Sequence, residues 1–268
     1  MENEKKIENP QSRREDTRLR AMNIVMDAGS TLLENGGEVF RVQQTMQIMA
    51  KSLGFADFQV YVVTNGIFAS AQGQGAHEVR YTPSIAVNLA KVEAVNELSR
   101  ELAGGRLEIP AAEERLAAIR AMPAYRCRTE LLAAALGGAS FCYLFGGRGA
   151  ALPAAFLAAG LELLLTKTLH RWKINRIFSD IASAALCTAL VLAAKLLLPG
   201  LDVNTAIIGA LMVLTPGVAL VMGIRDFINA DYLSGTIRLI SALLTAGSLA
   251  FGVGFTYTLM RLLPGVTV

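Results

Sequence analysis

The chain has few of the residues and short motifs that mark disulfide-rich domains, metal sites and common enzyme classes. Its 268 residues include three cysteines, one tryptophan and two histidines. Cys127, Cys142 and Cys187 show no CxxC or His-paired spacing, so we predict neither a disulfide framework nor a zinc site. No HExxH, GxSxG or Walker-type run occurs, which argues against a zinc protease, a serine hydrolase or an ATP-driven pump. We therefore expect no metal, no cofactor and no enzymatic activity.

An excess of charge of one sign is also missing, because 25 Lys and Arg residues face 22 Asp and Glu residues. The basic residues fall at segment ends rather than in a stripe with aromatic residues, so nucleic acid is not expected as a partner. The first 18 residues contain no apolar stretch that would serve as the core of a signal peptide. Residues 1–18 are expected to form a polar tail in the cytosol.

Apolar residues are abundant, at 53% of the chain with a mean hydropathy of +0.43. Most of the charge precedes about residue 128, whereas the remainder alternates long runs of Ala, Leu, Val and Ile with short polar breaks. This change in composition predicts a boundary near Tyr125 to Thr129, with one domain over residues 19–128 and another over residues 129–268.

The first domain is predicted to be a cytosolic α+β domain. Apolar residues spaced three or four apart, together with glycine and proline at segment ends, predict helices over residues 17–35, 39–53, 86–103 and 111–122. The runs FQVYVVT and IFASAQ predict two strands around Asn65-Gly66, a dipeptide that favours a type I′ hairpin turn. HEVRYT is expected to add a third strand after a turn at Gly73 to Gly75.

The second domain contains windows long and apolar enough to cross a bilayer core of about 30 Å, which needs roughly 20 helical residues. There are five such windows, at residues 130–147, 150–169, 177–198, 203–223 and 237–263. The predicted fold class is therefore a mainly α membrane protein, in which the cytosolic α+β domain precedes a bundle of about five transmembrane helices.

Basic residues alternate from one short break to the next. HRWKINR carries Arg171, Lys173 and Arg176, and the break after the fourth window carries Arg225 and Arg238, whereas PGLDVN carries no basic residue. Because short cytosolic loops are enriched in Lys and Arg, we expect the N-terminal domain in the cytosol and the C-terminus outside.

Glu162 is an acidic residue inside the second window. It precedes His170 by eight residues, which places it roughly 12 Å inside the cytosolic end of the helix. A charged side chain near the centre of a membrane helix costs on the order of 3 kcal/mol, so Glu162 should face a cavity or a partner, or be protonated. Two interpretations remain open: a proton-coupling or substrate-site carboxylate, or a structural hydrogen bond to a neighbouring helix.

Other residues in the membrane windows also have structural interpretations beside functional ones. Pro216-Gly217 falls inside the fourth window, where it predicts either a broken helix of the kind found at transport sites or a tolerated kink. Lys195 lies close enough to Pro199 for its ammonium to reach the outer interface. One face of the fifth window suits close helix packing or a polar path. Its residues are Ser241, Thr245, Ser248, Gly252 and Thr256.

Three stretches resemble the threonine/serine exporter family. They are GGEVFRVQQTMQIMAKSLGF with the following FQVYVVTNGIFAS, then NLAKVEAVNELSRELAGG, and finally LTPGVALVMGIRDFINADYLSGTIRL. The resemblance implies a multi-pass protein of the bacterial cytoplasmic (inner) membrane, with a cytosolic front domain and a transmembrane exporter domain. Single-chain members join this unit to a second, smaller transmembrane unit, so the resemblance also implies a smaller partner subunit and a higher oligomer.

The same resemblance implies a set of candidate functional positions. They are Arg41 in the cytosolic domain and Thr215, Pro216, Gly217, Arg225, Asp226, Asp231 and Gly235 in the second half of the chain. Each also has a structural interpretation. Arg41 would form a surface ion pair. Asp226 would neutralise Arg225, and Gly235 would open the last helix.

The first hypothesis is a subunit of a secondary exporter that moves threonine, serine or small dicarboxylates such as succinate across the lipid bilayer. Glu162, Asp226 and Asp231 would carry coupling ions or balance the charge of the small-molecule substrate. The alternative is a membrane-anchored sensor or scaffold whose cytosolic domain binds a ligand or a protein. An enzyme in the cytosolic domain is a third possibility, for which the sequence offers no reactive constellation.

Overall fold

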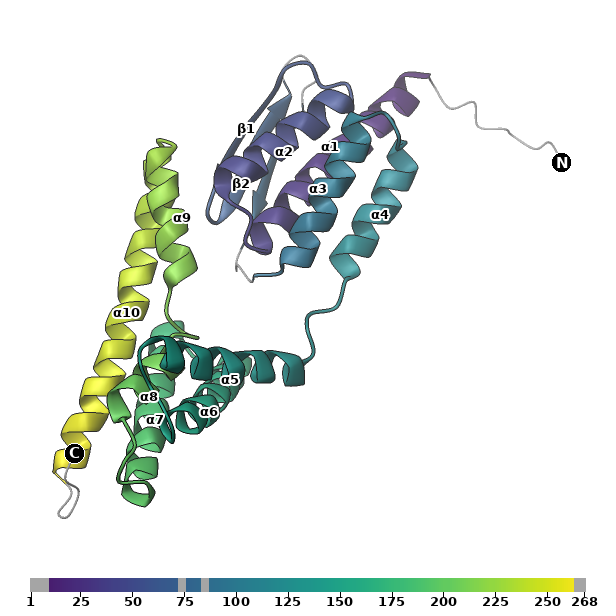
Figure 1. The fold of residues 1–268 in the computed structure, drawn as a ribbon. Coiled ribbons are helices and arrows are strands. Elements are labelled where there is room, and N and C mark those ends of the chain that lie inside the picture. The colour runs from purple at the N-terminus through teal and green to yellow at the C-terminus, as the bar shows by residue number, and fades with distance from the viewer. Residues whose placement is uncertain (1–9, 72–75, 83–86, 263–268) are drawn as a thin grey trace. The chain divides into compact units, whose positions relative to one another are not determined.

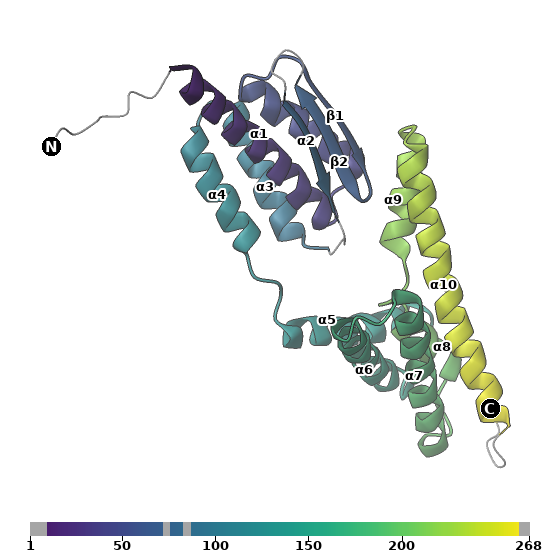
Figure 2. The same ribbon diagram turned by 180° about the vertical axis from the view of Figure 1, so that it is seen from behind.

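The computed structural model describes residues 10–71, 76–82 and 87–262, and it contains two compact units. The first unit comprises residues 1–124 with residues 222–237, and the second comprises residues 125–221 with residues 238–268. Figure 1 labels the helices and strands along the chain, and Figure 2 shows them from behind. The predicted turn at Gly73 to Gly75 lies outside the described residues.

The first unit contains the four helices expected from the apolar periodicity. They are α1 (Pro10–Glu34), α2 (Val39–Ser52), α3 (Leu89–Ala103) and α4 (Ile109–Ala121). Helix α1 begins at Pro10 rather than at residue 17, so part of the expected polar tail is helical. The residues added at its start are mostly charged or polar and have fair helix propensity, so they extend the helix beyond its buried face.

Three antiparallel strands form one sheet in the order β1 (Phe58–Val63), β2 (Gly66–Ala71) and β3 (Ala76–Tyr81). The hairpin is confirmed, but the predicted turn is wrong by one residue. Val63 pairs with Gly66, so Thr64 and Asn65 form the turn, and neither Asn65 nor Gly66 has a positive φ. Gly66 also pairs with Tyr81 of β3, and a Cβ there would lie 3.3 Å from the Arg80 carbonyl oxygen. This glycine therefore serves the close approach of a third strand.

Helices α1 and α2 pack against one face of the sheet, and α3 and α4 pack on these helices in turn (Figure 1). The core lies between these elements, where each fully buried aliphatic side chain contributes about 1.5–3 kcal/mol. It includes Met22, Val25, Met26, Leu33, Val42, Met46, Met49, Val62, Ile67 and Leu98. The opposite face of the sheet carries exposed side chains.

The remaining helices follow in the second half of the chain. They are α5 (Cys127–Leu144), α6 (Ala151–Arg171), α7 (Arg176–Leu197), α8 (Val203–Leu211), α9 (Gly217–Ile228) and α10 (Tyr232–Arg261). Within the described ranges, three of them, α6, α7 and α10, are long and apolar enough to cross a membrane. The protein is thus mainly helical, with three candidate spans and a small sheet.

The fourth predicted window, 203–223, is two short helices rather than one. Helix α8 ends at Leu211, and the Thr215 hydroxyl donates to the Leu211 carbonyl oxygen at 3.0 Å in the turn that follows. Pro216 has no amide hydrogen to continue a helix, and its carbonyl oxygen accepts the Leu220 amide at the start of α9. The last helix is longer than predicted, because it begins at Tyr232 rather than at residue 237 and runs for 30 residues.

Small residues bring α5, α6 and α8 close together. A Cβ on Gly138 would lie 2.5 Å from the Ala159 Cβ, and one on Gly209 would lie 2.5 Å from the Cys142 Cβ. Helix α5 has 18 residues with Glu130 in its first turn, and Glu130 pairs with Lys167 of α6. These contacts make a tight helical core of mainly alanine and glycine on which α7 also packs.

Candidate functional site

Polar side chains are buried along the contacts of α6, α7 and α10 in the second unit. We refer to this set as the polar track. It comprises Glu162 and Thr166 from α6, Ser179, Asp180, Ser183 and Thr188 from α7, and Thr245, Ser248 and Thr256 from α10. Because buried polar groups in a membrane helix are costly, they concentrate where a neighbouring helix or a polar path accommodates them.

Helical spacing places the central members of the polar track together. Asp180, Ser183 and Cys187 follow one another at intervals of three and four residues and so share one face of α7. Glu162 and Thr166 are four residues apart on α6. The Thr166 and Ser183 hydroxyl oxygens are 2.7 Å apart, a hydrogen bond that joins the two helices.

Glu162 has the most demanding environment of the predicted site residues. Its side chain is 0% exposed, and among the described residues neither carboxylate oxygen has a partner that satisfies hydrogen-bond geometry. The Cys187 thiol, a weak donor, lies beside the carboxylate. An ionised carboxylate in such a place loses its hydration without replacement, so the neutral acid is the favoured form while the helices hold this arrangement.

Asp180 is a member of the site that the sequence analysis did not single out. It is only 5% exposed, the Arg176 Nε lies 3.8 Å from its Oδ2, and the Thr245 hydroxyl of α10 lies beside its carboxylate. Asp180 is the fourth residue of the predicted span 177–198, next to a basic loop, a region where charged residues are common. The spacing of Asp180, Ser183 and Cys187 is the signal that would have indicated a polar face.

The small and polar face of α10 packs against α7, which confirms the interpretation of close helix packing. A Cβ on Gly252 would lie 2.4 Å from the Ile181 carbonyl oxygen, and the Thr256 hydroxyl donates to the Ala185 carbonyl oxygen at 3.4 Å. Ser241 is exposed and does not belong to this buried face. Lys195 ends α7 with its ammonium donating to the Pro199 and Leu201 carbonyl oxygens.

The interval around Pro216-Gly217 is a helix break and not a kink. Thr215 and Gly217 are exposed, and the Gly217 amide donates to the Thr215 carbonyl oxygen at 2.8 Å in a tight turn. Backbone that leaves a helix must find other partners at membrane depth, and the Thr215 hydroxyl provides one of them here.

Residues 222–237, which belong to the first unit, comprise the end of α9, a short turn at residues 229–231 and the start of α10. The Asp231 Oδ1 accepts the Ser234 amide at 3.2 Å, so Asp231 caps α10. Gly235 lies in the first turn of α10, where a Cβ would meet the Phe227 ring at 2.9 Å and the Gly223 carbonyl oxygen at 3.0 Å. Asp231 thus caps a helix, and Gly235 allows α9 and α10 to approach closely.

Arg225 has an acidic partner that the sequence analysis did not name. Its guanidinium forms an ion pair with Glu38, which precedes α2. Asp226 is buried, at 3% exposure. Arg41 is exposed on α2, and no ion pair at this residue occurs within the described ranges.

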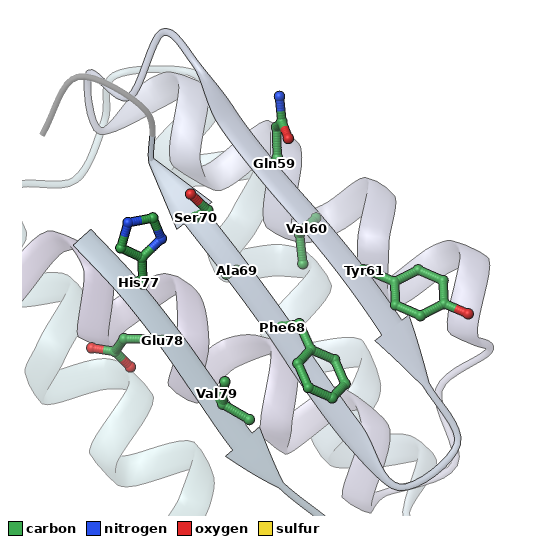
Figure 3. Close-up of a pocket in the computed structure, with 9 residues that line it drawn as sticks. All are labelled: Gln59, Val60, Tyr61, Phe68, Ala69, Ser70, His77, Glu78 and Val79. Carbon is green, nitrogen blue, oxygen red and sulfur yellow. The ribbon is translucent and has the colours of Figure 1, made fainter. Parts of the chain in front are cut away.

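A shallow groove of about 450 Å³ lies on the open face of the sheet (Figure 3). Tyr61 and Phe68 extend side by side from β1 and β2, with ring centroids 6.5 Å apart, and Val79 and His77 extend from β3. All four side chains are exposed. The first unit therefore presents an aromatic surface that is separate from the polar track.

Comparison with protein families matches residues 23–260 to ThrE, the family of threonine/serine exporters. The chain belongs to the threonine/serine exporter family. No curated protein and no solved structure matches it in the corresponding comparisons. Family membership, together with the apolar length of α6, α7 and α10, identifies a multi-pass membrane protein of the exporter class.

In this exporter-family chain, the polar track lies on all three candidate spans. Glu162 is on α6, Asp180 is on α7 and Thr245 is on α10. Of the predicted site residues, Glu162 belongs to the polar track, which also contains Asp180. Arg225, Asp231 and Gly235 lie in the other unit and do not belong to this cluster.

Proposed function

We propose that this chain is one subunit of a secondary exporter of small polar metabolites, with threonine and serine as the primary substrates and small dicarboxylates such as succinate as further candidates. The observation that carries the proposal is Glu162, which is fully buried on a candidate span of an exporter-family chain. Without a strong hydrogen-bond donor, its carboxylate is stable only when protonated or when a cation or water reaches it. A group with those two states can couple substrate movement to a proton.

The arrangement we propose is a bacterial inner-membrane complex with the N-terminal domain in the cytosol and the C-terminus outside. The basic loop between α6 and α7, with Arg171, Lys173 and Arg176, supports this orientation if α5 crosses the membrane as well as α6, because two crossings return the loop to the cytosol. A smaller transmembrane partner subunit and a higher oligomer would supply the rest of the pathway. The limited number of candidate spans in the described residues favours such a partner.

The test is efflux of preloaded labelled threonine, serine and succinate from cells that express the chain with and without the small membrane protein proposed as its partner. We expect efflux only when both proteins are present, and we expect a protonophore to abolish it. Glu162→Gln should remove the proton dependence. The matched control is Asp202→Asn, because Asp202 is exposed and caps α8 through a side-chain oxygen that asparagine retains.

Absence of efflux in either case, with both proteins confirmed in the membrane, would favour the anchored sensor. The aromatic groove on the open face of the sheet is the observation that supports this second candidate. In a sensor, replacing Tyr61 and Phe68 with serine would abolish ligand or protein binding, whereas replacing Glu162 would not.

A further inference from the structure

Two buried carboxylates of the polar track lie on adjacent helices with a pair of hydroxyl groups between them. We propose that Asp180 is a second proton carrier of the exporter and that it exchanges protons with Glu162 through the Thr166–Ser183 hydroxyl pair. This inference rests on the proposed function and deepens it, because it assigns the route by which a proton reaches the buried acid.

The spacing of the four groups supports the route. Asp180 precedes Ser183 by three residues on α7, and Glu162 precedes Thr166 by four residues on α6, so each carboxylate is a near neighbour of one hydroxyl, at roughly 5–6 Å between Cβ atoms. The two hydroxyl oxygens are 2.7 Å apart.

The two carboxylates also lie at different depths. Cys187, which lies beside Glu162, follows Asp180 by seven residues on α7, a rise of about 10 Å. Asp180 is in the first part of α7, near the basic loop, and Glu162 is deeper in the candidate span. A proton that moves from one carboxylate to the other therefore crosses about a third of a 30 Å bilayer core.

The chemistry needs no reactant beyond these groups and water. A hydroxyl accepts a proton on its oxygen and releases its own, so it ends the step neutral. The Thr166 hydroxyl donates to the Glu162 backbone carbonyl oxygen at 2.9 Å, so Ser183 is the donor within the hydroxyl pair. In the relay, the Asp180 acid gives its proton to Ser183, Ser183 gives its own to Thr166, and Thr166 turns from the carbonyl oxygen and gives its own to Glu162. Asp180 thereby becomes a carboxylate and Glu162 becomes an acid. The relay requires one bridging water in each interval between a carboxylate and its hydroxyl.

The surroundings of the two acids differ in a way that gives the route a direction. Asp180 has the cationic Arg176 at 3.8 Å, His170 of α6 nearby and the Thr245 hydroxyl of α10 beside it. These groups favour its ionised form and offset part of the cost of burial, which favours the neutral acid. Among the described residues, the polar group recorded beside Glu162 is the Cys187 thiol, a weak donor. Glu162 therefore holds a proton more readily than Asp180, and the deeper acid is the one that carries it between transport events.

Other charges on the packed helices do not compete for this role. Glu130 of α5 pairs with Lys167 of α6, and the α8 sequence contains no ionisable side chain. On α10, Arg238 precedes Thr245 by seven residues, about two turns away. A change in the pH dependence of transport on altering Asp180 would thus be assigned to the Asp180–Glu162 pair.

The experiment compares two modes of transport by the full chain, expressed with its partner subunit and reconstituted in liposomes. Net threonine flux driven by a proton gradient requires protons to cross, whereas exchange of labelled for unlabelled threonine at equal pH does not. We expect Asp180→Asn to lower gradient-driven flux by a factor on the order of 10² and to leave exchange at the wild-type rate. Asp180→Glu should restore gradient-driven flux.

The hydroxyl pair is tested by Ser183→Ala, which should slow gradient-driven flux while exchange continues. Ser241→Ala is the matched control, because Ser241 is also a serine on a candidate span but is exposed and lies outside the polar track. It should leave both modes unchanged.

Three results would overturn the inference. If Asp180→Asn and Ser183→Ala retained wild-type gradient-driven flux in an active exporter, there would be no relay. If Asp180→Asn lowered exchange and gradient-driven flux equally in correctly assembled protein, Asp180 would be a structural residue. If the wild-type pair moved no threonine in either mode, the proposed function would fail, and the relay would fail with it.

Discussion

The three acidic residues predicted to carry coupling ions or to balance substrate charge occupy three different environments. Asp231 accepts a backbone amide at the start of α10. Asp226 is almost fully buried, and its carbonyl oxygen accepts the Asp231 amide. Glu162 is buried in a candidate span with a thiol beside it. The residue type is nearly the same at each position. What separates a helix cap from a coupling candidate is the set of donors that the fold places within 3–4 Å.

The capping role of Asp231 predicts that its removal weakens the first turn of α10. Asp231→Ala should lower local stability by about 1 kcal/mol, whereas Asp231→Asn, which can still accept the Ser234 amide, should have little effect. Hydrogen exchange of the amides at 232–236 measures this directly, and the alanine variant should exchange about fivefold faster. Equal exchange in both variants, together with a loss of efflux in both, would instead indicate a direct role in transport.

The ion pair between Arg20 of α1 and Glu113 of α4 predicts a pH-dependent contribution to stability. The Arg20 guanidinium lowers the pKa of Glu113 below its usual range, mainly through the hydrogen bond between them. A lowered pKa in the folded state stabilises the protein above the ordinary glutamate pKa of about 4.3, and this contribution is lost as the pH falls through the lowered value.

Glu113→Gln should therefore lower the midpoint of thermal unfolding slightly at pH 7 and should match the wild type in strong acid. Glutamine keeps both methylene groups and the length of the glutamate side chain, so the difference in unfolding midpoint between the two proteins reports the charge. Glu114→Gln is the control, since Glu114 is exposed and no ion pair at this residue occurs in the described ranges. A constant difference between wild type and Glu113→Gln at all pH values would show that the ion pair contributes nothing through ionisation.

At the scale of helices and strands, the close approach of α7 and α10 depends on one glycine. Gly252→Ala would place a methyl group 2.4 Å from the Ile181 carbonyl oxygen, which the backbone of α7 cannot avoid without moving. Overpacking of this kind costs about 1–3 kcal/mol. The melting temperature of the purified protein in detergent should fall accordingly.

Gly247→Ala provides the comparison, because no atom lies within 4 Å of a Cβ at that position. Alanine favours a helix over glycine by about 1 kcal/mol, so this variant should melt at the same temperature as the wild type or higher. If both variants behaved alike, the contact between α7 and α10 would not be the cause.

Periodicity predicted the existence of most elements, since α2, α6 and α7 each have an apolar or small-residue face of regular spacing. It could not predict the break after Leu211, because a hydropathy average over twenty residues is insensitive to where a backbone hydrogen bond is lost. The prediction of a turn at Asn65-Gly66 was wrong for a different reason. The conformation of Gly66 is decided by its pairing with β3, a contact that local sequence does not contain.

The candidate site was predicted in part for a similar reason. Glu162 stood out because an acidic residue in an apolar window is rare. Asp180 did not stand out in the sequence, because its burial depends on which face of α7 meets α6 and α10. That choice is made by the contacts of Gly252 and of the Thr166–Ser183 pair, which are tertiary.

For the whole molecule, the proposed orientation can be tested with the native cysteines. Cys127 is exposed at the start of α5, whereas Cys142 and Cys187 are buried. If the N-terminal domain is cytosolic, the start of α5 is on the cytosolic side as well. A membrane-impermeant maleimide should then leave the chain unlabelled in intact cells and label it after permeabilisation, because only Cys127 presents an accessible thiol.

The variant Cys127→Ser decides whether the signal reports topology. It should remove the labelling of permeabilised cells, because the two remaining thiols lie within packed helices and react only when the protein unfolds. Labelling of intact cells that disappears in Cys127→Ser would place the start of α5 outside. If α5 and α6 both cross the membrane, the basic loop between α6 and α7 would then face outward too, against the charge asymmetry from which the orientation was inferred.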